Sequence, residues 1–346
     1  MQSFSAASLI EFGQRVFTAL GTPDDLAATV AASLVGANRA GHDSHGVIQL
    51  PVYARMAKEG SVLPAARASM RPANGMLATL VVDGALGWGP PAASLASEAI
   101  MERARSFGIG SAVVQRCHHI GRVGQYIERI TSARLVGIVM VNAGRGVAPF
   151  GGAKSMLGTN PIAIGAPRRA APPVMFDGST SMVAGNKIRV LQDKGLPVPD
   201  GWIIDRNGQS STRPQDLFEG GALLPLGGGS GHKGYGLSVM VEVLAGLLSG
   251  SSARALSEER AGGNGVMMIA LNPEAFTTRD DFLDDIETLC AGLKASPAMY
   301  AGGEVLLPGE PEARTRAERE NTGIPLPEAT LQALRTLGDE LDVRLN

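Results

Sequence analysis

The sequence predicts an α/β protein, and two observations support this prediction. From residue 90 onward, helical patterns alternate with short apolar strands, the order typical of a sheet with helices packed on it. The chain also has 45 glycines and 21 prolines, which supply the turns that short alternating elements need. Its length of 346 residues allows two domains of ordinary size, or one large α/β unit with appendages.

Composition and charge exclude several classes of protein. Hydrophobic residues make up 44% of the chain, charged residues make up 18%, and the net charge is −2, which is typical of a soluble globular protein without nucleic-acid partners. No apolar run reaches the roughly 20 residues of a membrane span, and the N-terminal residues do not resemble a signal peptide. The two cysteines, Cys117 and Cys290, are too few for a disulfide framework. We therefore expect a cytoplasmic protein without membrane partners.

The helical pattern of the first 40 residues leads directly into a polar segment. Leu9, Phe12 and Val16 recur at helical spacing, and Pro23 marks the first turn of a second helix. A short helix and a hairpin over residues 70–85 should follow, and the last helix of the chain should pack on the first ones. The later elements are expected as helices over residues 92–106, 124–133, 237–248, 282–295, 314–321 and 326–341, strands over 109–114, 136–142, 162–164, 174–178 and 266–271, and a turn-rich surface excursion over 187–215.

The polar segment, from Gly41 to Tyr53, is where we expect the chemistry. It places two histidines, an aspartate and a serine at four consecutive positions, 42–45, between a helix and a proline. The other histidines, His118, His119 and His232, also lie in turns beside glycine or another histidine. A single histidine in such a place more often caps a helix end, but this distribution favours a catalytic site.

The glycine-rich turns do not form a standard nucleotide motif. A Rossmann fingerprint needs G-x-G-x-x-G between a strand and a helix. Gly108 and Gly110 precede a strand instead, and Gly144 and Gly146 have no third glycine in register. A nucleotide cofactor is therefore compatible with the sequence, whereas a standard Rossmann domain is not expected. A metal site is not expected either, because the sequence has neither a helical histidine pair nor a C-x-x-C motif.

Three stretches of the sequence resemble the malate/L-lactate dehydrogenase family of nicotinamide-dependent oxidoreductases: Gly41–Tyr53, Cys117–Asn160 and Gly231–Gly250. This family is distinct from the Rossmann lactate dehydrogenases. The motifs are Asp-Ser-His-Gly-Val, Gly-Thr-Asn-Pro and Gly-His-Lys-Gly-Tyr-Gly, in family order. The segments Gly41–Gly46 and His118–Arg122 are most similar to the hydroxycarboxylate dehydrogenase B branch. The likeness extends over essentially the whole chain.

The resemblance implies the malate/L-lactate (sulfolactate) dehydrogenase-like fold. In this fold a central α/β cofactor-binding domain, expected over residues 76–295, packs on a helical domain made from both chain ends. The expected parts of that helical domain are residues 1–75, which carry the Ser-His motif, and residues 296–346. The resemblance also implies homodimers that share their active sites.

The implied activity is hydride transfer between NAD and a 2-hydroxy or 2-oxo carboxylic acid, with NADP as a possible cofactor. Reduction of a 2-oxo acid requires a proton donor, and a histidine suits that role. His45 is the first candidate, oriented by Ser44, and His119 is the second. The substrate-binding candidates are Ser44, Gln49, Tyr53 and Asn160.

The resemblance also implies a set of cofactor-binding residues. Among them, Arg122 or Lys233 can meet a phosphate, while Asp177 or Glu310 can accept the ribose hydroxyls and so favour NAD over NADP. The full set is Gly121, Arg122, Val123, Asp177, Gly178, Ser179, His232, Lys233, Asn272, Gly309 and Glu310.

One position departs from the family pattern. Many members carry arginine where Gln49 stands, and glutamine lacks the cationic fork that pairs with a substrate carboxylate. Either Arg55 or Arg122 can supply that charge instead, and Gln49→Arg should then change selectivity only if position 49 faces the substrate. Two alternatives stay open: a reductase of cyclic imino acids such as Δ1-piperideine-2-carboxylate, and an inactive relative that acts as a binding protein.

Overall fold

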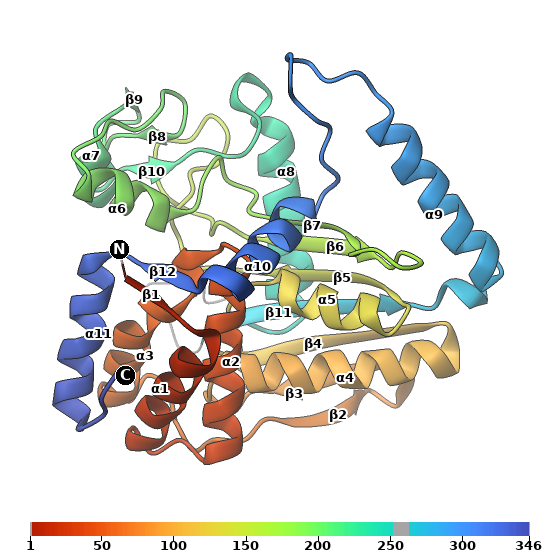
Figure 1. Cartoon of the computed structure of the whole chain (residues 1–346), viewed down its shortest axis with the longest axis horizontal. Coiled ribbons are helices and arrows are strands. Elements are labelled where there is room, and N and C mark those ends of the chain that lie inside the picture. The colour runs from red at the N-terminus through yellow and green to blue at the C-terminus, as the bar shows by residue number, and fades with distance from the viewer. Residues whose placement is uncertain (1, 252–262, 346) are drawn as a thin grey trace.

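The computed structural model describes residues 2–251 and 263–345. Among these residues, seven strands form the main sheet in the order β2-β3-β4-β11-β5-β6-β7, and all neighbours are antiparallel except β3 and β4. Figure 1 shows these strands stacked across the middle of the molecule. Their bounds are β2 Ser69–Ala73, β3 Met76–Asp83, β4 Ile109–Cys117, β5 Val136–Val141, β6 Ile162–Ala166, β7 Val174–Gly178 and β11 Asn264–Leu271.

The sheet confirms the predicted α/β class, and the hairpin is formed by β2 and β3 around a turn at Asn74 and Gly75, both with positive φ. One pairing was not predicted. β4 and β5 follow each other in the sequence, yet β11 lies between them and pairs with both. β11 is thus inserted antiparallel between two strands that precede it by more than 100 residues.

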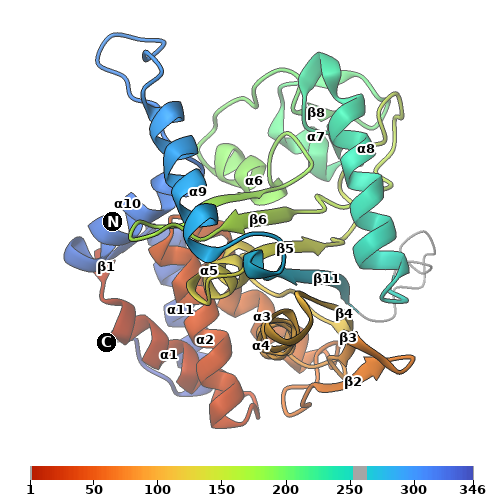
Figure 2. The same ribbon diagram turned by 90° about the vertical axis from the view of Figure 1, so that its right-hand side faces the viewer.

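Helices cover the sheet on both faces. On one face lie α4 (Gly89–Phe107) and α5 (Gly124–Ser132), and on the other lies α8 (His232–Val241) with the π-helix that continues it (Glu242–Leu247). The sequence of β5 follows this division, because Val139 and Val141 pack under α4 and α5 whereas Met140 packs under α8. Figure 2 shows the two layers on either side of the strands. No helix of the described residues is long and apolar enough to cross a membrane.

Both chain ends contribute to one helical core beside the sheet (Figure 1). It is formed by α1 (Ala6–Ala19), α2 (Asp24–Arg39), α3 (Leu50–Lys58) and α11 (Glu328–Leu341), and by the pairing of β1 (Gln2–Phe4) with β12 (Ile324–Leu326). α9 (Arg279–Lys294) and α10 (Glu310–Thr322) connect this core to the sheet. The helices of the N-terminal part end with α3, before β2 joins the sheet.

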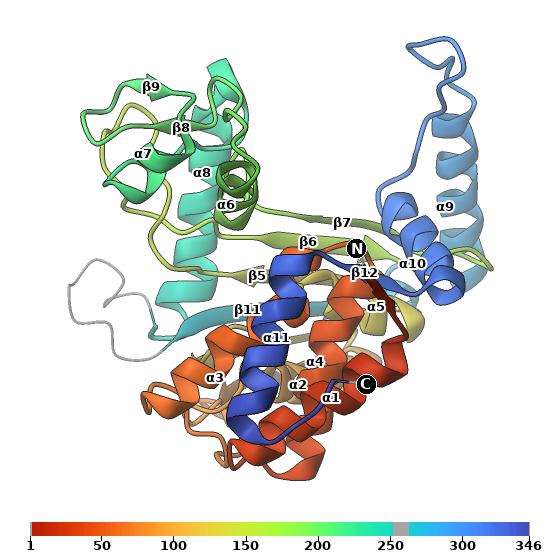
Figure 3. The same cartoon turned by 60° about the vertical axis from the view of Figure 1, so that its left-hand side comes forward.

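The stretch expected as a surface excursion is a small unit with its own core (Figure 3). Val183, Ile188, Ile203 and Leu223 are among the buried side chains that hold it together. The sequence did not predict its first helix, because Ala184 at the N-cap offers no capping side chain. The elements of this unit are α6 Gly185–Asp193, β8 Ile203–Ile204, β9 Ser210–Ser211, α7 Pro214–Phe218 and β10 Ala222–Leu223.

Candidate active site

A cavity of about 580 Å³, here called the central cavity, opens where strands of the sheet end. Three strands, β4, β5 and β7, run in one direction, and β11 runs in the other. The same end of the sheet therefore contains the last residues of β4, β5 and β7 and the first residue of β11. The segment 42–45, the loop after β4, the end of β7 and the first turn of α6 line the cavity. The central cavity therefore collects side chains from parts of the chain that are far apart in the sequence.

The segment 42–45 forms a short 3-10 turn, Asp43–His45, which is fixed from two sides. The Asp43 carboxylate accepts hydrogen bonds from Asn38 Nδ2 at 2.6 Å and from Arg319 Nη1 and Nη2 at 2.6 and 2.9 Å. Asn38 Oδ1 accepts the backbone N–H of Val47 at 2.8 Å. A Cβ atom at Gly46 would lie 2.2 Å from this amide oxygen, so position 46 must be glycine. The turn is thereby held between α2 and α10.

His45 lies on the cavity wall beside a second histidine. The Ser44 hydroxyl is 2.9 Å from His45 Nδ1, which leaves Nε2 to exchange a proton with a ligand. The His45 and His119 rings stack with centroids 5.5 Å apart. Burial, and to a smaller extent the nearby His119, His42 and Arg122, lowers the pKa of His45 to about 3. The ring is therefore neutral at neutral pH when the cavity holds no anion.

His119 is positioned by Tyr53. The tyrosine hydroxyl is 2.6 Å from His119 Nδ1, and its ring stacks on Trp88 with centroids 5.5 Å apart. Burial lowers the pKa of His119 to about 4. Tyr53 is only 2% exposed and does not line the central cavity. Its hydroxyl contacts His119, so its position allows it to orient that ring.

A buried charged cluster forms the adjacent wall. Arg122 is 2% exposed, and its Nη2 pairs with Glu128. Within the described part of the chain, Arg122 Nε and Nη1 have no hydrogen-bond partner. Asp177 accepts the N–H of Gly124 at 2.9 Å, and burial raises the pKa of its carboxyl. A guanidinium with two open donors beside a carboxylate can bind a ligand that carries both a phosphate and hydroxyl groups.

His42 adds a further contact to this wall. Its Nε2 lies 3.3 Å from Glu312 Oε1, and this contact holds the pKa of Glu312 below its usual range. The candidate residues that line the cavity are His42, Ser44, His45, His119, Gly121, Arg122, Val123, Asp177, Gly178 and Ser179.

Two substrate-binding candidates instead support the walls. Gln49 Nε2 donates to the Ser44 carbonyl at 2.7 Å. Asn160 is fully buried: its Oδ1 accepts the Ala143 N–H at 2.9 Å, and its Nδ2 donates to Ser238 and Glu242. Neither side chain lines the cavity. Each one instead holds the backbone of a residue that does, Ser44 for Gln49 and Ala143 for Asn160.

Five of the cofactor-binding candidates also lie away from the central cavity. His232 and Lys233 are exposed in the first turn of α8. Gly309 caps α10, and Glu310 binds Lys294 Nζ and the Leu307 N–H and lines a separate hollow of about 310 Å³.

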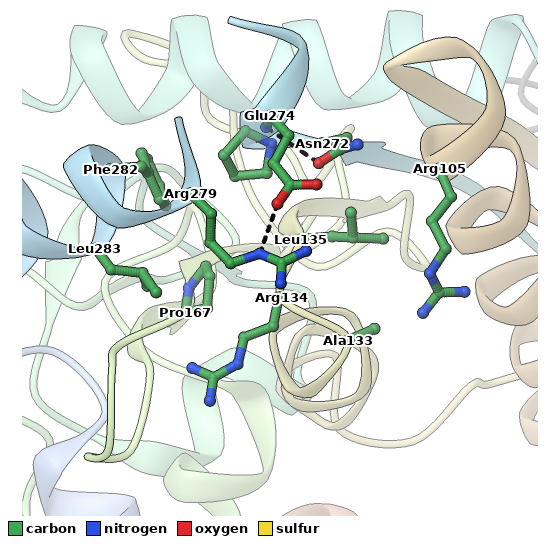
Figure 4. A pocket seen from close by; sticks show the side chains of 11 residues that line it. Arg105, Ala133, Arg134, Leu135, Pro167, Asn272, Glu274, Arg279, Phe282 and Leu283 are labelled. Atoms are coloured by element: carbon green, nitrogen blue, oxygen red, sulfur yellow. Dashed lines mark hydrogen bonds and ion pairs between the residues drawn. The ribbon is translucent and has the colours of Figure 1, made fainter. Parts of the chain in front are cut away.

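Asn272 lies at the far end of β11, in a third pocket of about 220 Å³ (Figure 4). There its Oδ1 accepts the Glu274 N–H at 3.1 Å, and Glu274 pairs with Arg279 at 2.6 Å. An eight-residue strand separates Asn272 from the central cavity, and this corresponds to roughly 25 Å of extended chain. Asn264, at the other end of β11, lines the cavity in its place.

Sequence reasoning missed several residues of the cavity besides Asn264. Met182 and Val183 provide apolar wall, and Asn186 and Lys187 enter from the first turn of α6. Asn186 Nδ2 lies 3.4 Å from the Ser44 carbonyl, so this turn is adjacent to the His45 loop. The sequence signal that could have indicated these residues was weak. It consists of an asparagine and a lysine that follow Gly185, in a stretch where the sequence did not predict a helix.

A family model described as malate/L-lactate dehydrogenase matches residues 4–335. Hydroxycarboxylate dehydrogenase B of Escherichia coli (strain K12) is 37% identical over 339 residues, which cover 96% of this chain and 92% of that protein. The (2R)-3-sulfolactate dehydrogenase (NADP(+)) of Chromohalobacter salexigens is 34% identical, with 92% of each chain covered.

Among solved structures, a putative malate/lactate dehydrogenase from E. coli superimposes with a TM-score of 0.92 and 36% identity, covering 99% of this chain and 96% of that one.

Proposed function

Because the chain belongs to the malate/L-lactate dehydrogenase family, we propose that it transfers a hydride between NAD and a 2-hydroxy or 2-oxo carboxylic acid. The observation that carries this proposal is the Ser44–His45 pair on the wall of the central cavity, stacked on a second histidine that Tyr53 orients. An oriented, neutral imidazole facing a cavity is suited to general acid–base catalysis.

His45 handles the proton in this proposal. In the oxidation direction its neutral Nε2 accepts the hydroxyl proton of the substrate, while Ser44 holds Nδ1. In the reduction direction the same nitrogen returns a proton to the carbonyl oxygen. A bound carboxylate raises the pKa of His45 from its low value in the open cavity, because a nearby negative charge stabilises the protonated ring. The nicotinamide cofactor, when bound, donates or accepts the hydride at the substrate carbon.

The charged wall fits the rest of the cofactor. The open Nε and Nη1 of Arg122 match a phosphate, and the Asp177 carboxylate matches ribose hydroxyls, with Gly178 and Ser179 beside it. A 2′-phosphate on the ribose would face the Asp177 carboxylate, and this repulsion supports NAD over NADP. The relative from C. salexigens is named for NADP, so the preference has to be established for this chain by experiment.

Asp177→Asn should weaken the preference for NADH over NADPH at least tenfold. The amide oxygen can still accept the Gly124 N–H, so the loop stays in place while the negative charge is lost. The measurement is kcat/KM for each cofactor with one 2-oxo acid. Glu310→Gln is the matched comparison, because it removes the other carboxylate suggested by the sequence. If Glu310→Gln changes the preference and Asp177→Asn does not, the ribose lies in the second hollow.

A panel of 2-oxo acids and cyclic imino acids, each with NADH and NADPH and followed at the nicotinamide absorbance, tests the activity itself. Turnover of 2-oxo acids supports the proposed dehydrogenase. Turnover confined to cyclic imines would assign the protein as an imine reductase, and no turnover with any substrate would favour a binding protein.

We also propose a homodimer that shares its active sites. The segment that includes α8 exposes apolar side chains: Leu237, Met240 and Leu248 are 44%, 49% and 59% exposed. On the neighbouring strands, two further exposed apolar residues pair in register, Ile164 and Phe176. α5 packs on one face of β6 and β7. On the opposite face, Figure 3 shows no helix of the described elements between α8 and α9. A second copy on this face would cover the apolar surface and reach His232 and Lys233.

Sedimentation velocity at micromolar concentration should give the mass of two chains, and Leu248→Glu should shift the protein toward monomer. A fully active monomer would contradict both the dimer and the shared site.

A cytoplasmic location is the last part of the proposal. It rests on Cys117 and Cys290, which are both free and buried. Free thiols persist in a reducing compartment. Fractionation of cells that express the protein tests this location.

A further inference from the structure

The substrate of the proposed reaction carries a carboxylate, and its binding requires a cation in the central cavity. This inference therefore rests on the proposed function. Of the described residues that line the cavity, one arginine and one lysine supply a cationic side chain besides the histidines: Arg122 and Lys187. The question is which of the two meets the substrate.

Two of the residues that the sequence suggested for this role, Gln49 and Arg55, do not line the cavity. Gln49 is bonded to the Ser44 carbonyl. The Arg55 side chain is 66% exposed, lies 4.0 Å from Glu59 and does not line the cavity. Charge for the substrate must therefore come from another position.

Arg122 is placed for the cofactor. Its Nη2 pairs with Glu128. A Cβ atom added at Gly124 would contact both Asp177 Oδ2 and Arg122 Nη1, which shows that these two groups lie close to each other. The guanidinium thus serves the wall that fits phosphate and ribose. Its two open donors, Nε and Nη1, are buried within that wall.

Lys187 lies in the first turn of α6, and α6 is adjacent to the His45 loop through the contact of Asn186 with the Ser44 carbonyl. Its Nζ lies 5.6 Å from the centroid of the Trp202 ring. In the part of the chain that the structure describes, no acidic side chain pairs with Lys187. The first turn of α6 also lacks a side-chain cap, so its positive end stays open to an anion.

We propose that Lys187 binds the carboxylate of the 2-oxo or 2-hydroxy acid and so directs the reacting carbon and oxygen toward His45. In this proposal α6 supplies the charge that the family resemblance led us to expect at position 49. Because a lysine offers a point charge on a flexible stem, this arrangement tolerates acids with different side chains better than a rigid guanidinium would. The apolar walls at Met182 and Val183 receive those side chains.

The test compares Lys187→Met with Lys187→Arg and Lys194→Met. Lys194 caps the other end of α6, is exposed and does not line the cavity, so it matches Lys187 in chemistry and helix but not in location. Lys187→Met should raise KM for a 2-oxo acid roughly 10- to 100-fold, the effect of losing a charge-assisted contact. The KM for NADH should stay within about twofold. Lys187→Arg should retain most of the affinity, and Lys194→Met should match the unmodified protein.

A second measurement does not depend on turnover. Oxamate carries the same carboxylate but cannot be reduced, and its binding to the complex with NADH can be followed by calorimetry. Lys187→Met should weaken oxamate binding by the same factor, and thermal unfolding confirms that the variant is folded. If KM and oxamate affinity are unchanged in Lys187→Met while the unmodified protein reduces 2-oxo acids, the inference is overturned and the proposed function stands. If the unmodified protein reduces no 2-oxo acid, the proposed function itself is overturned.

Discussion

Replacement of His45 by asparagine will lower kcat roughly 10²- to 10⁴-fold, the usual contribution of a general acid–base group. Asparagine retains a hydrogen-bonding side chain next to Ser44 but cannot accept and return a proton. The affinity for NADH should change less than about twofold, because the charged wall at Arg122 and Asp177 is untouched. Steady-state kinetics together with NADH fluorescence titration separate the two effects.

The stacked partner is the control for this assignment. His119 has its own hydrogen bond with Tyr53, and burial lowers its pKa as well, to about 4, so the geometry alone allows it to act as the proton donor. If His119→Asn loses turnover while His45→Asn keeps nearly all of it, the proton donor is His119.

The pH dependence provides independent evidence. With a pKa of about 3 in the open cavity, His45 is almost entirely neutral at pH 7, so its protonated fraction rises as pH falls. Reduction of a 2-oxo acid needs the protonated ring, and its kcat/KM should rise as pH is lowered from 8 to 5. Oxidation of the hydroxy acid needs the neutral ring, and its kcat/KM should stay nearly constant over that interval. Equal profiles in both directions would argue against a histidine with a lowered pKa.

Arg319→Gln will lower kcat by roughly 10- to 100-fold although Arg319 lies outside the central cavity. Its guanidinium forms two hydrogen bonds with the Asp43 carboxylate and a third with the Asn38 carbonyl. These contacts set the position of the turn that carries His45, and a displacement of about 1 Å at a reacting group can cost 10²-fold in rate. Kinetics should show the loss mainly in kcat, with the melting temperature little changed.

Arg314→Gln is the matched control for this prediction. Arg314 lies on the same helix, α10, but it is exposed and pairs with Glu304, away from the His45 turn. Its replacement should leave kcat unchanged. Equal losses in both variants would mean that α10 as a whole, and not the Arg319–Asp43 contact, supports the turn.

The elements that the sequence predicted best are those whose local pattern repeats. Apolar spacing located α1, α2, α4 and α5, and short apolar runs located β4, β5 and β11. The order of strands was beyond this reasoning, because the pairing of β11 with β4 and β5 depends on contacts between residues more than 100 positions apart. α6 was missed because its N-cap lacks a side-chain signal.

The sequence likewise indicated some residues of the candidate site and not others. Clustered polar motifs indicated His45, Ser44 and His119, and the family resemblance implied Asp177. The structure places all four on one cavity. The role of Tyr53 could not be predicted, since a tyrosine in a helix gives no sign of which histidine its hydroxyl will meet. The resemblance implied Asn272, which follows β11, whereas Asn264 at the start of the same strand lines the cavity. Which end of a strand lies at a cavity depends on its pairing with distant strands, and the sequence alone does not give that pairing.

The contact between Asp43 and Arg319 joins residues 276 positions apart, and this separation bears on how the enzyme is made in the cell. Ribosomes add about 5–20 residues per second, so roughly 15 to 55 seconds pass between synthesis of the catalytic turn and synthesis of the arginine that fixes it. α11, which completes the helical core, is made later still. During this interval α1 and α2 lack part of the apolar surface that covers them in the finished protein. We therefore expect nascent chains to be inactive until the C-terminal helices have left the ribosome, and to need protection of that surface until then.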